Sequence, residues 1–95
     1  MLDPLDPQVY VPDGITPNND GINDRLIIEG IENHEENELI IFDRWGNMIF
    51  QASPYKNSWN GIYNGTDLPE GAYYYVLKTD ITNKRTLKGR VYIIR

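Results

Sequence analysis

The side chains best suited to chemistry gather in residues 16–26, where Asn, Asp and Gly replace the apolar runs found elsewhere. Asn18, Asp20, Asn23 and Asp24 bring amide and carboxylate oxygens, which are the ligands that Ca²⁺ prefers in proteins. The same residue types also accept hydrogen bonds from the backbone two positions further on, and so shape tight turns without any ligand. Two interpretations follow: a calcium site, or a compact turn held by its own side chains.

The match to an EF-hand calcium loop fails at its ends. Asp20 and Gly21 imitate the middle of such a loop. Aligning Gly21 with the glycine of that loop places Thr16 at the first ligand position and Ile27 at the twelfth, where a bidentate carboxylate is required. We therefore predict a self-capped turn that leads into a strand near Leu26, and no metal or other cofactor. A calcium site of another geometry, built on the four side chains named above, is the alternative.

Catalytic chemistry finds little support in the sequence. The only histidine, His34, lies in an acidic loop, and the only serines are Ser53 and Ser58. A nucleophile needs a base within hydrogen-bond reach and a third group to orient that base, and no spacing here assembles them. We predict that the protein is not an enzyme and that His34 lies in a solvated loop.

Four aromatic side chains raise a second binding hypothesis. Trp45, Trp59, Tyr55 and Tyr63 lie among Gly and Asn turns. Together they would form a flat platform of the kind on which sugar-binding sandwiches stack a carbohydrate. Large aromatics in a small domain more often fill its core, and we expect that role for Trp59 and for the tyrosines of residues 72–77.

Length and composition restrict the class of protein. A chain of 95 residues forms one domain, and without cysteine its stability must come from packing. The formal net charge of -5 argues against nucleic acid as a partner, because phosphates are bound by basic surfaces. No apolar run approaches the length of a membrane span, and no basic-then-apolar signal peptide opens the chain. If the protein is exported, we expect this chain to be part of a longer precursor.

The pattern of apolar runs predicts an all-β protein. Short β-rich runs are separated by Asn-Gly, Pro and Gly turns, and helix signals are nearly absent. We predict an immunoglobulin-like antiparallel β-sandwich of about six to seven strands. The expected strands are residues 9–11, 26–29, 38–43, 48–50, 72–78 and 86–94.

Four local features of the chain are specific enough to test. Residues 38–43 are apolar on both faces, which is typical of a central strand covered on both sides. Gly46 and Asn47 suit a two-residue type II′ hairpin loop, which has glycine first. Gly89 within the last strand indicates a β-bulge. Residues 1–7 double the triplet Leu-Asp-Pro, which favours an extended linker before a folded domain over residues 8–95.

Three blocks of sequence, in this order and spacing, resemble one known family. The first is Val-Pro at residues 11–12 with Thr-Pro-Asn-Asn-Asp-Gly-Ile-Asn-Asp at residues 16–24. The second is Ile-Phe-Asp-Arg-Trp-Gly at residues 41–46 with Ile-Phe at residues 49–50. The third joins Trp-Asn-Gly at residues 59–61, Asn-Gly at 64–65, Leu-Pro-Glu-Gly at 68–71 and Tyr-Tyr-Tyr-Val at 73–76. From residue 10 to residue 95 the chain resembles the gliding-motility-associated C-terminal domain of Bacteroidota, the type B sorting domain of the type IX secretion system.

Small departures from the family pattern do not disturb this resemblance. Ile15 stands where an aromatic residue is common, Asn19 where Gly is common, and Asn60 where Asp is common. The change at Asn60 removes a carboxylate from any metal site at that position.

The resemblance implies a function. Such domains are non-catalytic C-terminal export signals that direct large cell-surface proteins, adhesins among them, through the type IX secretion system across the outer membrane. The implied partners are the translocon components, an outer-membrane protein of the PorP/SprF type, and N-terminal cargo of the same chain. The implied route runs through the periplasm to the cell surface or extracellular space, and an end at Arg95 fits a terminus without a tail. An extracellular carbohydrate- or calcium-binding β-sandwich module is the alternative.

A folded signal must be recognised through its surface, so we expect recognition at exposed turns and edges rather than in a cleft. Our hypothesis is that the Asx-rich turn and the hairpin turn at residues 44–47 are rigid, and that one or both are recognised. The final strand offers a second route, because an edge strand can add to a partner's sheet through backbone hydrogen bonds. The candidate residues are Thr16, Pro17, Asn18, Asp20, Gly21, Asn23, Asp24, Arg44, Trp45, Gly46, Trp59, Gly61 and Arg95.

Overall fold

The structure, a computed structural model, describes residues 9–18, 20–34, 36–80 and 85–95. Strands make up nearly all of its regular structure, and a 3-10 turn, η1 (Ile31–Asn33), precedes the second strand. Within the described ranges, no helix is long and apolar enough to cross a membrane. The strands are β1 (Gly14–Ile15), β2 (Glu38–Phe42), β3 (Met48–Ala52), β4 (Ile62–Tyr63), β5 (Thr66–Asp67), β6 (Gly71–Asp80) and β7 (Arg85–Ile93).

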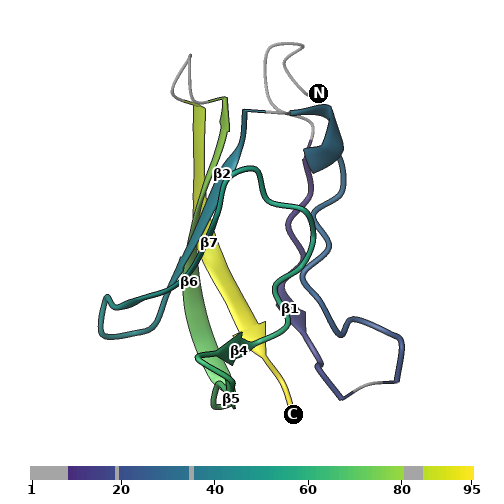
Figure 1. The fold of residues 1–95 in the computed structure, drawn as a ribbon, viewed down its shortest axis with the longest axis vertical. Coiled ribbons are helices and arrows are strands. Elements are labelled where there is room, and N and C mark those ends of the chain that lie inside the picture. Colours follow the sequence, from purple (N-terminus) through teal and green to yellow (C-terminus); the bar gives the residue numbers. More distant parts are fainter. Residues whose placement is uncertain (1–8, 19, 35, 81–84) are drawn as a thin grey trace.

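Five of these strands form one sheet in the order β1-β7-β6-β2-β3 (Figure 1). β6 and β7 make its longest antiparallel pair, from Gly71 opposite Ile93 to Asp80 opposite Arg85. β1 pairs with the end of β7 in parallel, so the sheet is mixed where we expected only antiparallel pairs. β4 and β5 form a separate two-stranded hairpin. The predicted all-β sandwich is confirmed, with this one change in strand direction.

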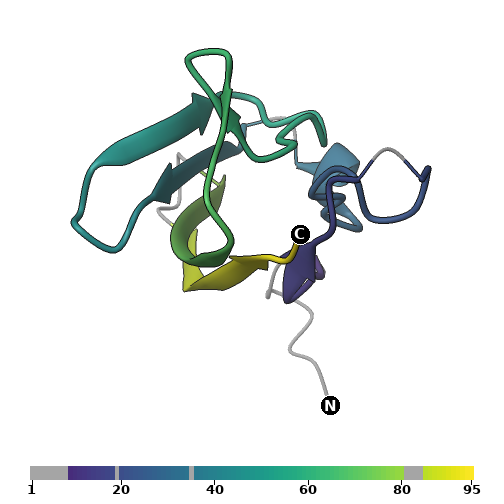
Figure 2. The same ribbon diagram turned by 90° about the horizontal axis from the view of Figure 1, so that it is seen from below.

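The second layer of the sandwich consists of extended segments rather than a regular sheet. Residues 9–11, 26–29 and 53–60 lie together on one side of the five-stranded sheet (Figures 1 and 2). The strands that we predicted at residues 9–11 and 26–29 are therefore wrong, because the only β-bridge of either segment among the described residues is an isolated antiparallel one between Tyr10 and Glu29.

The hydrogen bonds of residues 26–28 explain the missing strand. The backbone N–H of Leu26 donates to the carbonyl oxygen of Trp59 (2.8 Å), but that of Ile28 donates to the side-chain oxygen of Asn57 (2.8 Å). A side-chain acceptor thus replaces a carbonyl of the ladder, and regular pairing stops. The period-two alternation survives, since Leu26 and Ile28 are buried while Ile27 is exposed.

The core lies between the two layers. Trp59 and Tyr73 are buried in it, as predicted, whereas Tyr74 is exposed and the prediction of a core role is wrong for that residue. The alternation of β6 turns Tyr74 to the opposite face of the sheet. The buried apolar side chains are Ile15, Leu26, Ile28, Ile31, Leu39, Ile41, Ile49, Tyr55, Trp59, Tyr73, Leu77, Val91 and Ile93.

β2 takes the central position that its sequence predicted, between β3 and β6. Leu39 and Ile41 are buried against the second layer, and Ile40 and Phe42 alternate with them on the other face, where they are half-buried. The prediction of cover on both faces is wrong for the described residues, because the second layer lies on one side only (Figure 2).

β2 and β3 form the predicted hairpin, but with a longer loop. The N–H of Asp43 donates to the carbonyl of Asn47 (2.9 Å), and the N–H of Gly46 donates to the carbonyl of Asp43 (3.0 Å). The loop therefore comprises residues 44–46, with Gly46 in the left-handed region at a φ of 84°. This arrangement is typical of a type I turn followed by a G1 bulge, so the predicted type II′ loop is wrong.

The bulge predicted at Gly89 is also wrong. Gly89 lies directly opposite Tyr75, and the irregularity in the β6–β7 register falls between Lys78 and Asp80. A Cβ at position 89 would lie 2.6 Å from the hydroxyl oxygen of Tyr75, so glycine leaves room for that ring. The predicted linker at residues 1–7 lies outside the described residues.

Candidate recognition surface

The Asx-rich loop that follows β1 is closed by one carboxylate. Asp24 Oδ1 accepts a hydrogen bond from the backbone N–H of Asn18 (3.1 Å), and Asp24 Oδ2 accepts one from that of Gly21 (2.8 Å). Hydrogen bonds to an ionised acceptor are stronger than those between neutral groups. Asp24 therefore holds both arms of the loop in place.

Further Asx turns complete the loop. Asp20 Oδ1 accepts from the N–H of Ile22 (2.8 Å), and Asn18 Oδ1 accepts from the N–H of Asp20 (3.2 Å). At the base, the N–H of Thr16 donates to the carbonyl of Asn23 (2.8 Å), whose own φ is positive at 55°. The predicted self-capped turn is confirmed.

The hydrogen bonds of the Asx-rich loop occupy oxygens that a calcium ion would need. Calcium needs several oxygens aimed at one point, whereas oxygens of Asp20 and Asp24 already face backbone N–H groups. Among the residues that the structure describes, no group of three or more His, Cys, Asp or Glu could hold a metal ion. The hydrogen bonds of Asp20 and Asp24 therefore favour a structural role for the loop. Calcium binding stays an alternative that a calcium titration can test.

A second carboxylate closes the hairpin turn. Asp43 Oδ1 accepts from the backbone N–H groups of Trp45 and Asn47 (both 2.9 Å), and Oδ2 accepts from the side-chain amide of Asn47 (3.1 Å). These bonds lower the pKa of Asp43 below its usual 3.8, and the bond from the Asn47 backbone N–H has the largest effect. The turn displays Trp45, which is 75% exposed, and the Arg44 guanidinium lies 5.0 Å from its ring centroid. That distance is typical of a cation–π contact.

Trp59 does not contribute its side chain to any exposed surface. It is 1% exposed, and its ring centroid lies 6.4 Å from that of Phe50 and 6.2 Å from that of Tyr73. Its Nε1 has no hydrogen-bond acceptor within the described part of the chain. Trp45 and Trp59 therefore cannot share one sugar-binding platform.

Arg95 binds two segments where the sheet ends, residue 61 and the turn at residues 68–71. Its Nε donates to the carbonyl of Leu68 (2.8 Å), its Nη2 to the carbonyl of Gly61 (3.2 Å), and its backbone N–H to the carboxylate of Glu70 (3.0 Å). Gly61 has a φ of 79°, and a Cβ there would lie 3.3 Å from Ile93 and 3.4 Å from the guanidinium. Two candidates from distant parts of the sequence, Gly61 and Arg95, thus meet in one corner.

The Asx-rich loop, the hairpin turn and the segments bound by Arg95 all lie toward the lower end of the sandwich in Figure 1, and the view from below in Figure 2 shows the Asx-rich loop and the hairpin turn at opposite sides of that end. A pocket of about 270 Å³ joins the Asx-rich loop to residues 60–62. Another of about 250 Å³ lies between the hairpin turn and residues 68–73. Arg95 bonds to both of these neighbouring segments. We call this surface, made of residues 16–18, 20–25, 43–47, 60–62, 68–71 and Arg95, the end surface.

The final strand offers less free edge than we expected. β7 lies between β1 and β6, and its residues Tyr92 and Ile93 pair with β1. Residues 86–91 pair with β6 on one side and with no other strand of the described chain. The prediction that a partner adds a strand to the edge of β7 therefore applies to residues 86–91 alone.

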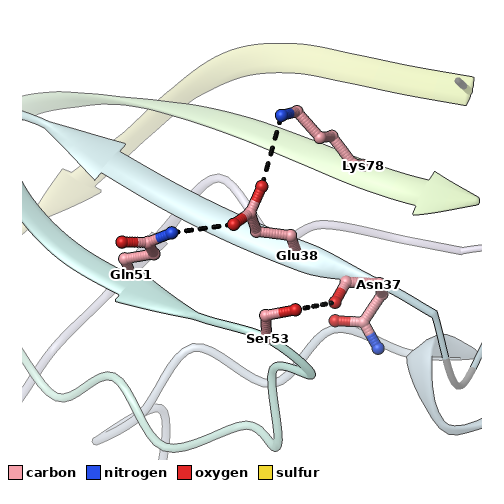
Figure 3. A network of polar contacts seen from close by, with 5 residues as sticks. All are labelled: Asn37, Glu38, Gln51, Ser53 and Lys78. Atoms are coloured by element: carbon pink, nitrogen blue, oxygen red, sulfur yellow. Dashed lines mark hydrogen bonds and ion pairs between the residues drawn. The ribbon is translucent and has the colours of Figure 1, made fainter. Parts of the chain in front are cut away.

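Sequence reasoning missed a polar network that links three strands (Figure 3). Glu38 accepts a hydrogen bond from the side chain of Gln51 (2.7 Å) and forms an ion pair with Lys78 (3.2 Å). The bond from Gln51, and then that from Lys78, lower the pKa of Glu38. Beside it, the hydroxyl of Ser53 donates to the carbonyl of Asn37 (3.3 Å). Only the register of the strands brings these residues together, so no local signal could have found them.

A second missed network is centred on Tyr55. Its hydroxyl donates to the carbonyl of Leu26 (2.5 Å) and accepts from the N–H of Trp59 (3.1 Å), while its own N–H donates to the side chain of Asn37 (2.7 Å). Burial raises the pKa of Tyr55 to about 12. The side-chain amide of Asn37 also donates to the carbonyl of His34 (2.7 Å). His34 is half-buried, so it is less solvated than the sequence predicted.

Comparison with known proteins agrees with the architecture. Residues 9–93 match the CHU_C type IX secretion signal domain. No curated protein gives a significant match. Among solved structures, PorZ of Porphyromonas gingivalis, described as an essential bacterial surface component of its type IX secretion system, is similar with 24% identity and a TM-score of 0.69. That match covers 93% of this chain but only 12% of PorZ, so it shows a shared fold and not a shared role. Because the family match spans most of the chain, this protein belongs to the CHU_C type IX secretion signal domain family.

Proposed function

We propose that this domain is a C-terminal export signal that carries a large, adhesin-like cell-surface protein through the type IX secretion system across the outer membrane. Membership of the family supports a secretion signal, export toward the cell surface or beyond, and a non-catalytic role. The observation that carries the proposal is the position of the motif turns at one end of the sandwich, where Arg95 bonds to Gly61, Leu68 and Glu70.

The end surface has the properties of a recognition site. Asp24 and Asp43 each lock a turn by accepting backbone hydrogen bonds, so little conformational entropy would be lost on binding. Trp45 and Arg44 project from one of those turns, and aromatic residues and Arg are the residue types that most often dominate binding energy. We propose that an outer-membrane protein of the PorP/SprF type recognises this surface.

Fusion of the full chain to a foreign cargo tests the export function. The fusion is expressed in a Bacteroidota host behind an N-terminal signal peptide, and the cargo is measured in the periplasm, at the cell surface and in the medium. We expect export that needs both the domain and the translocon, and that is lost when one PorP/SprF-type protein is deleted. Periplasmic retention of a folded fusion in the intact host would refute the proposal.

Point variants test whether the end surface is recognised. Trp45→Ala and Arg44→Gln alter exposed side chains, so we expect unchanged stability but export reduced by about tenfold. Tyr10→Ala is the matched control, since Tyr10 is 58% exposed and its backbone bridges to Glu29, outside the end surface. Asp24→Ala separates architecture from recognition: normal export by a folded variant would remove Asp24 from the recognised set.

The alternative function is carbohydrate binding. It is supported by the exposed side chain of Trp45, on which a sugar ring could stack. Such a module would bind soluble glycans with a change in Trp fluorescence, and Trp45→Ala would abolish that binding while leaving export intact. Export that depends on Trp45 in a chain that binds no glycan supports the signal function instead.

A further inference from the structure

The side of the five-stranded sheet that faces away from the second layer carries a group of apolar side chains at its centre. Strand register places Phe42, Tyr74 and Arg90 in one row across three strands, and Ile40, Val76 and Lys88 in the next. Burial alternates along each strand, so these six side chains share one face. Antiparallel sheets with one solvated face usually carry polar residues on it. We call these six residues the outer sheet face.

Nothing in the described chain covers this face. The second layer lies on the other side of the sheet in both views (Figures 1 and 2). Tyr74 is 41% exposed, and Ile40, Phe42 and Val76 are half-buried. None of these four belongs to the core or to the partly buried residues packed against it.

Two sequence blocks that identify the family supply this face. Within residues 41–46, Ile41 is explained by the core, but Phe42 points to the opposite side. Within residues 73–76, Tyr73 is core, whereas Tyr74 and Val76 alternate away from it. Neither the core nor the end surface therefore accounts for the apolar side chains at 42, 74 and 76.

The charges around the face point to the chemistry of an occupant. Glu38, at one end of the same face, is engaged by Gln51 and Lys78 (Figure 3). Lys88 and Arg90 are exposed on β7, and within the described chain neither forms an ion pair. The face thus combines an apolar centre with two cations on one border, in a protein of net charge -5.

We propose that the outer sheet face docks a protein of the export machinery that presents apolar side chains bordered by carboxylates. The apolar groups cover Ile40, Phe42, Tyr74 and Val76, and the carboxylates meet Lys88 and Arg90. A second copy of the chain fits less well as the occupant. Its carboxylate on this face, Glu38, already binds Gln51 and Lys78 and so cannot easily pair with Lys88 or Arg90 of the other copy. This inference rests on the proposed export function and adds a second contact surface, distinct from the end surface.

Export of the full-length fusion provides the first test. Lys88→Glu and Arg90→Glu reverse exposed charges, and Val76→Thr keeps a β-branched side chain but replaces one methyl group with a hydroxyl group. Each charge reversal is expected to lower export by about tenfold, and Val76→Thr by about threefold, as for contacts at the centre of an interface. Lys56→Glu and Tyr10→Thr are matched controls at exposed positions outside the outer sheet face, and their export should equal that of the parent. Parental export by all three folded face variants would overturn the proposal.

A photocrosslinking measurement keeps the two proposals distinguishable. Benzophenone-alanine is placed at position 74 of the fusion, or at position 10 as control, and illuminated in the host. We expect an intermolecular adduct from position 74 that weakens at least about fivefold with Lys88→Glu but not with Lys56→Glu. This result would support docking even if the cargo never reached the medium, in which case the export function alone would fail. No adduct, a fusion dimer, or a crosslink within the fusion would overturn the choice of occupant.

Discussion

The ring of Tyr75 lies across Gly89 on the neighbouring strand, and a Cβ built on Gly89 falls 2.6 Å from the Tyr75 hydroxyl oxygen. Two ring carbons lie at 2.8 Å from the same point. Gly89→Ala must therefore displace the ring, and we expect the free energy of unfolding to fall by about 1–3 kcal/mol. Urea denaturation at neutral pH measures the change.

A double-mutant cycle checks that this cost comes from the ring. In a Tyr75→Ala background the space is empty, and Gly89→Ala should be neutral or slightly stabilising, because alanine suits a strand better than glycine. Equal costs in the two backgrounds would show that Tyr75 and Gly89 are not coupled.

Asp24 is expected to be the most important side chain of the Asx-rich loop for stability. Asp24→Ala leaves the N–H groups of Asn18 and Gly21 without their acceptor, and we expect a loss of about 1–3 kcal/mol in the free energy of unfolding. Asp67→Ala is the control, since Asp67 is exposed on β5, and its effect should stay within about 0.5 kcal/mol. A loss no larger than that of the control would contradict the locking role of Asp24.

The long strands were predictable because their patterns are local. Residues 38–43 and 72–78 are runs rich in β-branched, aromatic and other apolar residues, and their bounds agree with β2 and β6 to within two residues at each end. Residues 26–29 are equally apolar, yet form no strand, because the acceptor for Ile28 is the side chain of Asn57. A contact between segments so far apart leaves no trace in the local pattern.

The same distinction applies to the candidate site. The hairpin turn with Trp45 was predictable from its own residues, since Asp43 and Gly46 are typical turn formers. The contact between Arg95 and Gly61 joins residues 34 positions apart and depends on the way the loops fold over the sheet. The outer sheet face was visible only as apolar residues on both faces of β2, and the sequence could not indicate which face would be covered.

Added calcium is expected to leave the melting temperature unchanged. Carboxylate oxygens of Asp20 and Asp24 face backbone donors, so a cation that took these oxygens as ligands would have to replace those hydrogen bonds. A site with a Kd of about 0.1 mM would add about 2.7 kcal/mol at about 10 mM Ca²⁺. That gain would raise the melting temperature by well over about 5 °C in a domain of this size. Thermal unfolding in CaCl₂ and in MgCl₂ distinguishes the cases, and a calcium-specific rise lost in Asp24→Asn would establish the calcium alternative.

The hairpin carboxylate predicts a loss of stability in acid. Hydrogen bonds lower the pKa of Asp43 below 3.8 in the folded state, so the folded state binds fewer protons than the unfolded state in that range. Its contribution is present above about pH 5 and is lost as the pH falls through the lowered pKa. Asp43→Asn should therefore flatten the acid limb of the stability profile. Urea unfolding from about pH 7 to about pH 2 tests this. A residual slope is expected, because the pKa of Glu38 is also lowered.

Tyr55 joins the two layers of the sandwich through its hydroxyl group. Tyr55→Phe keeps the edge-on contact with Phe50 at 5.8 Å, but leaves the carbonyl of Leu26 and the N–H of Trp59 unpaired in the core. We expect the free energy of unfolding to fall by about 1–3 kcal/mol. Tyr63→Phe removes a hydroxyl from an exposed ring and should change it by less than about 0.5 kcal/mol.

The same residue predicts behaviour in alkali. Burial raises the pKa of Tyr55 to about 12, whereas the unfolded chain loses this proton near the usual value of 10.0. Between these values the folded state holds more protons than the unfolded state, so stability must fall as the pH rises. Tyr55→Phe lacks that proton, and the stability gap between parent and variant should narrow from pH 9 to about pH 12. A constant gap over this range would show that the Tyr55 hydroxyl is not buried with its proton.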